Sequence, residues 1–97
     1  MTLNITQKIR TKLQKKHGVS EDEILECFAN RDGKFLTDTR ENHRTDPPTK
    51  WFVAETNQGR LLKVVFIQYD NGETHIKTAY QANEKEIEIY EKFAKSR

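Results

Sequence analysis

The sequence is short of the residues that carry covalent or metal-dependent chemistry. It has a single cysteine, Cys27, so the chain can form no internal disulfide. We therefore expect an inert thiol in a reducing compartment, the cytoplasm. The three histidines lie far apart, no HxxxH, HExxH or CxxC spacing occurs, and the four glycines match neither GxGxxG nor GxxxxGKS/T. The sequence therefore predicts no metal site and no cofactor.

Long apolar runs are also missing. Hydrophobic residues make up 34% of the 97 residues and charged residues 33%, and no stretch approaches the roughly 20 apolar residues of a membrane span. The opening MTLNITQKIR lacks the apolar core of a signal peptide. Because the net charge is only +2 and the apolar residues fall in periodic runs, disorder is not expected. We predict one small domain, residues 1–97, with no membrane partner.

Charge is unevenly distributed along the chain. The first 20 residues hold five cations and no acidic residue, whereas the last predicted helix is rich in glutamate. The five cations are Lys8, Arg10, Lys12, Lys15 and Lys16. A basic segment attracts nucleic acid or an acidic partner, and a solvated helix face is the alternative for each lysine.

Capping signals predict two helices in the first third of the chain. Asn4 precedes isoleucine and leucine at four-residue spacing, and Gly18 ends this first helix. Ser20 and Glu23 have the spacing of a capping box, so a second helix begins there. Asn30 and the residues that follow it end this helix.

Aliphatic and aromatic runs predict the strands. Three runs are long, KWFVAET (50–56), GRLLKVVFIQY (59–69) and THIKTAYQA (74–82), and GKFLTDT (33–39) is a shorter fourth. Residues 39–50 form a polar connection in which Pro47 and Pro48 exclude helix. Asn83 and Glu86 then begin a last helix, whose expected inward face is Ile87, Tyr90, Phe93 and Ala94. The order predicts an α+β fold: two N-terminal helices, a three- to four-stranded antiparallel meander and a C-terminal helix.

The Asn71-Gly72 pair predicts a tight hairpin and thereby a register. One face should pair Lys63 with Tyr80, Val65 with Thr78 and Ile67 with Ile76. The other face should pair Val64 with Ala79, Phe66 with Lys77 and Gln68 with His75. Tyr80 and Lys63 would then lie on one face of the sheet, with His75 and Lys77 on the other.

Several short motifs occur in one order: KHGVS (16–20), DTR (38–40), KW (50–51), GRLLKVV (59–65) and TAYQANEKEIEIY (78–90). Together they resemble the BrnT-like toxins of type II toxin–antitoxin modules, which have a RelE-like fold, and the resemblance covers most of the chain. It implies a small ribonuclease that blocks translation. It also implies RNA as substrate and a small ribbon-helix-helix antitoxin as protein partner.

One position departs from that family pattern. Tyr80 stands where the family has an arginine in its SARxA element. Loss of a guanidinium removes a bidentate phosphate clamp. A binding module that has the same fold and no cleavage activity is therefore the alternative function.

The chain has a second resemblance, to small bacterial proteins often described as ADP-ribosyl-(dinitrogen reductase) hydrolases. The matching residues include Cys27, Phe28, Asn30, Arg31, Asp46, Pro47, Pro48, Trp51 and Glu55. The enzymes with that activity resemble large helical proteins with a two-metal carboxylate site, whereas this chain has three main strands and no carboxylate cluster. The absence of such a cluster argues against hydrolysis of ADP-ribose, which we keep as the third alternative.

Metal-independent RNA cleavage assigns roles to particular residues. It needs a base for the ribose 2′-hydroxyl, cations for the phosphate and an acid for the leaving oxygen. We predict His75 as base or acid, Tyr80 as proton donor or stacking ring, and Trp51 as a stacking platform. The expected phosphate-binding cations are Arg40, Arg60, Lys63 and Lys77. His17, beside Gly18 at a helix end, is expected to bind terminal carbonyls instead.

Overall fold

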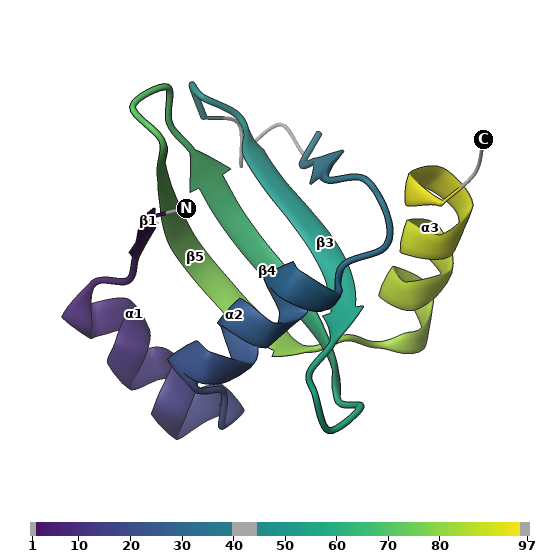
Figure 1. Cartoon of the computed structure of the whole chain (residues 1–97), viewed down its shortest axis with the longest axis horizontal. Coiled ribbons are helices and arrows are strands. Elements are labelled where there is room, and N and C mark those ends of the chain that lie inside the picture. Colours follow the sequence, from purple (N-terminus) through teal and green to yellow (C-terminus); the bar gives the residue numbers. More distant parts are fainter. Residues whose placement is uncertain (1, 40–44, 96–97) are drawn as a thin grey trace.

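The chain folds into a five-stranded mixed sheet with helices on both sides (Figure 1). This computed structural model describes residues 2–39 and 45–95. The strands are β1 (Thr2–Asn4), β2 (Leu36–Thr37), β3 (Thr49–Glu55), β4 (Leu61–Gln68) and β5 (Glu73–Gln81), in the order β1-β5-β4-β3-β2. The helices are α1 (Gln7–Lys12), its π-helical continuation η1 (Leu13–His17), α2 (Glu21–Asn30) and α3 (Glu84–Ala94). In Figure 1, α1 and α2 lie in front of the sheet and α3 lies beyond β3.

The α+β class, the three helical regions and the antiparallel meander of β2 to β5 are as predicted. The sheet differs from the prediction because β1 adds a fifth strand that runs parallel to β5. Asn4 lies in that strand opposite His75, and Thr6 caps α1 instead by accepting a hydrogen bond from the Ile9 amide. A three-residue strand is too short to show a periodic pattern, so only its pairing partner reveals it.

The β4–β5 register agrees with the prediction over half its length. Lys63 lies opposite Tyr80, and Val65 opposite Thr78. The register then shifts by one residue, because Phe66 pairs with Ile76 and leaves Lys77 without a partner across the strand. The predicted pairs beyond this β-bulge, Phe66–Lys77, Ile67–Ile76 and Gln68–His75, are therefore wrong. A bulge inserts one residue and reverses the facing of those beyond it, so His75 lies opposite Ile67 on the same face as Tyr80.

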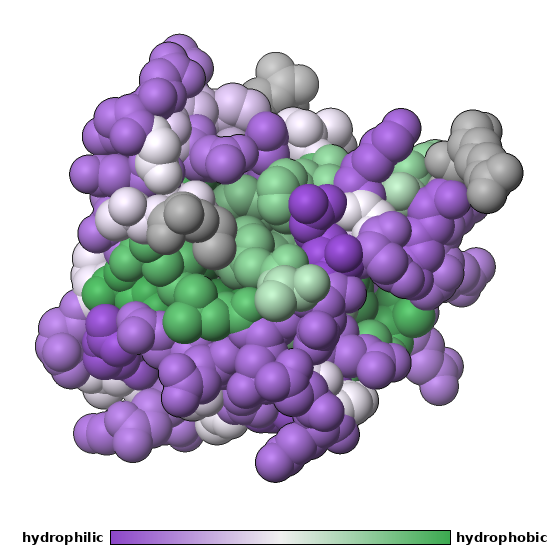
Figure 2. Space-filling model, viewed as in Figure 1, coloured by the Kyte–Doolittle hydropathy of each residue, from purple (hydrophilic) through white to green (hydrophobic). Residues whose placement is uncertain are grey.

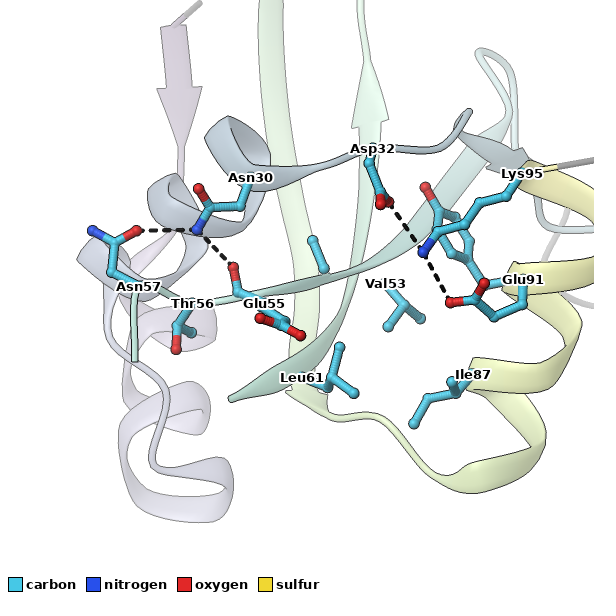
Figure 3. A pocket seen from close by; sticks show the side chains of 12 residues that line it. Asn30, Asp32, Val53, Glu55, Thr56, Asn57, Leu61, Ile87, Glu91 and Lys95 are labelled. Carbon is cyan, nitrogen blue, oxygen red and sulfur yellow. Dashed lines mark hydrogen bonds and ion pairs between the residues drawn. The ribbon is translucent and has the colours of Figure 1, made fainter. Parts of the chain in front are cut away.

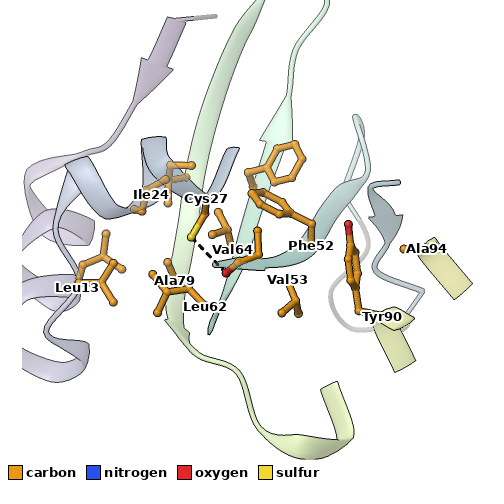
Figure 4. Packing of buried hydrophobic residues seen from close by; sticks show 14 residues of the cluster. Leu13, Ile24, Cys27, Phe52, Val53, Leu62, Val64, Ala79, Tyr90 and Ala94 are labelled. Atoms are coloured by element: carbon orange, nitrogen blue, oxygen red, sulfur yellow. Dashed lines mark hydrogen bonds between the residues drawn. The ribbon is translucent and has the colours of Figure 1, made fainter. Parts of the chain in front are cut away.

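The main core lies between the front helices and the sheet (Figure 4). Its centre is an aromatic cluster of Phe28, Phe35, Phe52 and Phe66, with ring centroids 4.7–6.2 Å apart. Phe52 and Phe66 are fully buried, and a buried ring contributes roughly 1.5–3 kcal/mol to stability. Cys27 is fully buried beside it, and burial is the main reason why the pKa of its thiol rises to about 12. This cysteine is therefore an inert core residue.

The surface over these front helices is not uniformly polar. Figure 2 shows hydrophobic surface gathered in the middle of this view, between hydrophilic margins. Leu25 of α2 is a large hydrophobic residue, yet it is 42% exposed. No helix among the described residues is long and apolar enough to cross a membrane.

Helix α3 packs on the second face of the sheet through Tyr90 and Ala94, which are 1% and 3% exposed. The Tyr90 ring lies 6.0 Å from Trp51, and no space remains between this ring and Gly33. Phe93, expected on the inward face of this helix, is 58% exposed instead. The start of α3 reaches β4 and β5 through Glu86, and Ile87 lies near Val53 and Leu61 (Figure 3). The helix packs mainly against β2 and β3, at one margin of the sheet, and Phe93 lies on the side of α3 that these strands do not cover.

Gly33→Ala should lower the free energy of unfolding by about 1–3 kcal/mol, the usual cost of overpacking. An added Cβ would lie 2.7 Å from the Tyr90 hydroxyl oxygen. That hydroxyl has no hydrogen-bond partner in the described part of the chain, so Tyr90→Phe should cost little by itself and should restore part of the loss in the double variant. Urea denaturation measures all three variants. Equal losses for Gly33→Ala with and without Tyr90→Phe would contradict this explanation.

Candidate nucleic-acid interface

Four residues on the second face of the sheet form one connected group, here called the Glu86 cluster: Trp51, Lys63, Tyr80 and Glu86. The Lys63 ammonium lies 3.0 Å from Glu86 Oε2, and the Tyr80 hydroxyl donates to the same oxygen at 2.8 Å. The Lys63 and Glu86 side chains are only 12% and 16% exposed. The cross-strand pairing of Lys63 with Tyr80 therefore places an ammonium and a phenol at one carboxylate.

Trp51 completes the cluster from the neighbouring strand β3. The Lys63 ammonium lies 4.5 Å from the centre of the Trp51 ring and 5.9 Å from that of Tyr80. A cation held over aromatic faces gains roughly 0.5–2 kcal/mol. The rings and the carboxylate together compensate Lys63 for the loss of water around its charge.

Glu86 is directed to this place by the cap of its own helix. Its Oε1 accepts a hydrogen bond from the Asn83 amide at 3.0 Å, which completes the predicted capping box. Burial raises the pKa of Glu86, but the hydrogen bonds from the Asn83 amide, the Tyr80 hydroxyl and Lys63, and the charge of Lys63, outweigh burial and lower it. The carboxylate is thus ionised at neutral pH and holds the cluster together as an anion.

His17 contacts the cluster from η1, with its ring centroid 5.6 Å from that of Tyr80. Burial lowers the pKa of His17, and the nearby charges of Lys12 and Lys16 lower it further. Its ordinary value is 6.5, so the imidazole is neutral at pH 7 and can accept a proton.

Arg60 takes the structural role that was expected of His17. Its guanidinium donates to the carbonyl oxygens of Gly18 and His17 at 2.8 and 3.0 Å, and it pairs with Glu23 at 3.2 Å. These contacts close the C-terminal end of η1. The His17 ring is therefore free of that role and lies against Tyr80.

The helical segment that contains His17 carries four exposed lysines, of which Lys12 and Lys16 are near enough to lower the pKa of the imidazole. They are Lys8, Lys12, Lys15 and Lys16, all exposed and all without an ion pair to the residues that the structure describes. Arg10 differs because it pairs with Glu21 at 3.2 Å. An unpaired cationic surface beside a neutral imidazole suits a phosphate-bearing ligand.

The other predicted site residues lie apart from the cluster. His75 lies at the far end of β5 from Tyr80. Its Nε2 is 2.9 Å from Glu73 Oε1, and its ring packs against Tyr69. Lys77, the bulged residue, is exposed. Arg40 lies outside the described residues. The structure thus brings together Trp51, Lys63 and Tyr80.

Two residues of this surface have roles that the local sequence pattern does not predict. The capping-box spacing marks Glu86 only as a helix cap, although its place six residues after Tyr80, shortly after the strand end, is the signal for its contact with Tyr80. His17 was expected to bind carbonyls, because the competing Arg60 is 43 residues away. Long-range competition of this kind leaves no local pattern in a sequence.

No protein-family model matches the chain, and a search of curated proteins finds no match either. Within residues 2–39 and 45–95, no group of three His, Cys, Asp or Glu side chains could hold a metal ion.

Glu86→Gln should destabilise the protein by about 1–3 kcal/mol at pH 7, the range for hydrogen bonds to a charged group. The folded-state pKa of Glu86 is lowered, so its contribution is present above its unfolded value near 4.5 and is lost as the pH falls through the folded value. The difference between wild type and variant should therefore shrink at pH 3. Urea denaturation at pH 7 and pH 3 measures it.

Glu88→Gln is the matched control, because Glu88 is exposed on the same helix and makes no ion pair with a described residue. Its effect should be within about 0.5 kcal/mol at both pH values. If both variants lost the same free energy of unfolding at pH 7 and at pH 3, the contacts of Glu86 with Lys63 and Tyr80 would not contribute to stability.

Proposed function

We propose that this protein is an RNA-directed endoribonuclease that works without a metal ion and acts as the toxin component of a toxin–antitoxin module on a variant of the RelE-like layout. The observation that carries the proposal is the neutral His17 imidazole beside Tyr80, at the edge of an unpaired lysine surface. The resemblance of KHGVS and TAYQA to BrnT-like toxins supports it, because both motifs meet at this point.

The chemistry follows from the positions of these groups. His17 removes the proton of a ribose 2′-hydroxyl, whose oxygen then forms a bond to the adjacent phosphorus. The bond from phosphorus to the 5′-oxygen breaks, and that oxygen takes the Tyr80 proton, so the Tyr80 hydroxyl gives up its hydrogen bond to Glu86 Oε2 in this step. Lys12 and Lys16 neutralise the phosphate. Lys63 stabilises the resulting phenolate, and the products are a 2′,3′-cyclic phosphate and a 5′-hydroxyl.

A second function, RNA or protein binding without cleavage, is favoured by a different observation. Glu86 already accepts hydrogen bonds from both Lys63 and Tyr80. The carboxylate neutralises the lysine charge and holds the phenol in a fixed contact. In this function the surface binds a strand and leaves it intact.

Expression of the chain alone in bacteria should arrest growth, since a toxin of this kind is held inactive by a small ribbon-helix-helix antitoxin. His17→Ala and Tyr80→Phe should each relieve the arrest and slow cleavage of a purified RNA about 10²-fold or more, as for loss of a general base or acid. Cleavage should persist in EDTA. It should fall in acid as His17 becomes protonated, at a pH below the ordinary histidine value of 6.5 because the pKa of His17 is lowered by burial and by Lys12 and Lys16. If cells grow normally at every expression level and the purified protein leaves RNA intact, the nuclease function is wrong and the binding function is favoured.

Affinity for a single-stranded oligoribonucleotide should depend steeply on salt in either function. Each phosphate contact adds about 0.7 to the slope of log K against log salt, so Lys12→Ala/Lys16→Ala should reduce the slope by about 1.4. Fluorescence anisotropy with a labelled oligomer measures it. Lys34→Ala, an exposed cation between α2 and β2, is the control. If Lys34→Ala reduced the slope as much as each lysine of the double variant does, the protein would attract RNA through its overall positive charge and not through a site at Lys12 and Lys16.

A further inference from the structure

A hollow of about 630 Å³ lies between α3 and strands β2 and β3, here called the aromatic groove. Its apolar lining is Leu36, Trp51, Ile89 and Phe93. Trp51 and Lys63 line the groove and also belong to the Glu86 cluster. The groove therefore continues directly from the surface to which the proposed function assigns the phosphate and ribose of RNA.

Phe93 supplies an accessible aromatic ring. At 58% exposure it is the most exposed large hydrophobic residue of the described chain. Its neighbours Tyr90 and Ala94 are buried, so α3 is firmly packed and presents this ring on a rigid element. Bases of single-stranded nucleic acids stack on rings of this kind, whatever their identity, because each base has a π-face.

Apart from Lys63, the polar lining of the groove consists of Thr37, Asp38 and Thr39. Both threonines are exposed. Thr37 belongs to β2, the edge strand of the described sheet, which pairs only with β3. Hydroxyls, and backbone N–H and C=O groups that no further strand occupies, can hydrogen-bond the edge of a base.

We infer that the aromatic groove binds one unstacked nucleobase of single-stranded RNA, next to the nucleotide whose phosphate lies on the His17–Tyr80 side. The inference deepens the proposed function and rests on it. The volume is within the range of about 300–1,000 Å³ for small-ligand sites. Eight described residues line the groove, whereas one side of a stable protein interface has roughly 20–30. A base fits this hollow, and a folded partner would need a larger surface.

Trp51 is the one tryptophan of the chain, so its fluorescence reports on the groove. Adenosine 5′-monophosphate should quench it, and ribose 5-phosphate, which lacks the base, should not. A hexanucleotide should bind more tightly than its abasic counterpart. Phe93→Leu should weaken the hexanucleotide about fivefold or more without affecting the abasic strand, whereas Phe93→Tyr should keep wild-type affinity. Leu25→Ala, an exposed apolar residue of α2, should change nothing.

The outcomes separate this inference from the function on which it rests. Equal binding of abasic and intact strands, with salt dependence retained, would overturn the base site and leave RNA binding standing. Loss of binding to every strand would overturn both. Wild-type affinity in Phe93→Leu would show apolar contact in place of stacking. A wild type that dimerises in sedimentation, with Phe93→Ala monomeric, would assign the groove to a second copy of the chain and overturn the inference.

Discussion

The arrangement of side chains on the second face of the sheet depends on one carboxylate, that of Glu86. Glu86 closes the cap of α3 with one oxygen, and with the other it accepts from Lys63 of β4 and Tyr80 of β5. Because a helix end and two strands meet at this group, the placement of α3 and the orientation of both side chains are coupled. An ammonium as little exposed as that of Lys63 would be costly without such a partner.

The two faces of the sheet are covered in different ways. The front face is closed by α1, η1 and α2 over an aromatic core, with the Arg31 guanidinium stacked on Phe35, and it supplies most of the buried apolar residues. The second face is covered by α3 only at one margin. Lys63 and Tyr80 of this face are bound by Glu86, whereas the buried Thr78 hydroxyl has no hydrogen-bond partner among the described residues. The aromatic groove stays open beside the Glu86 cluster. The candidate chemistry lies where Tyr80 of this second face meets His17 of η1.

The residue-level predictions succeeded where local rules decide and failed where distant residues compete. The Asn-Gly hairpin placed Lys63 opposite Tyr80 correctly, but a one-residue bulge at Lys77 reversed the facing of His75. The capping boxes at Ser20 and Asn83 are present as predicted. His17 was predicted to cap its own helix, and Arg60 does so from another strand. Of the candidate site, Trp51, Lys63 and Tyr80 lie together, while His75 and Lys77 do not.

The sequence by itself determined the helices, the long strands, the hairpin turn and the residue types available for function. These follow from periodicity, capping and turn chemistry, which act over a few neighbouring residues. Only the tertiary structure decided which of those residues meet. The parallel β1 strand, the bulge, the contact of His17 with Tyr80 and the exposure of Phe93 all depend on packing between segments far apart in the chain. Such packing is settled by the whole fold at once.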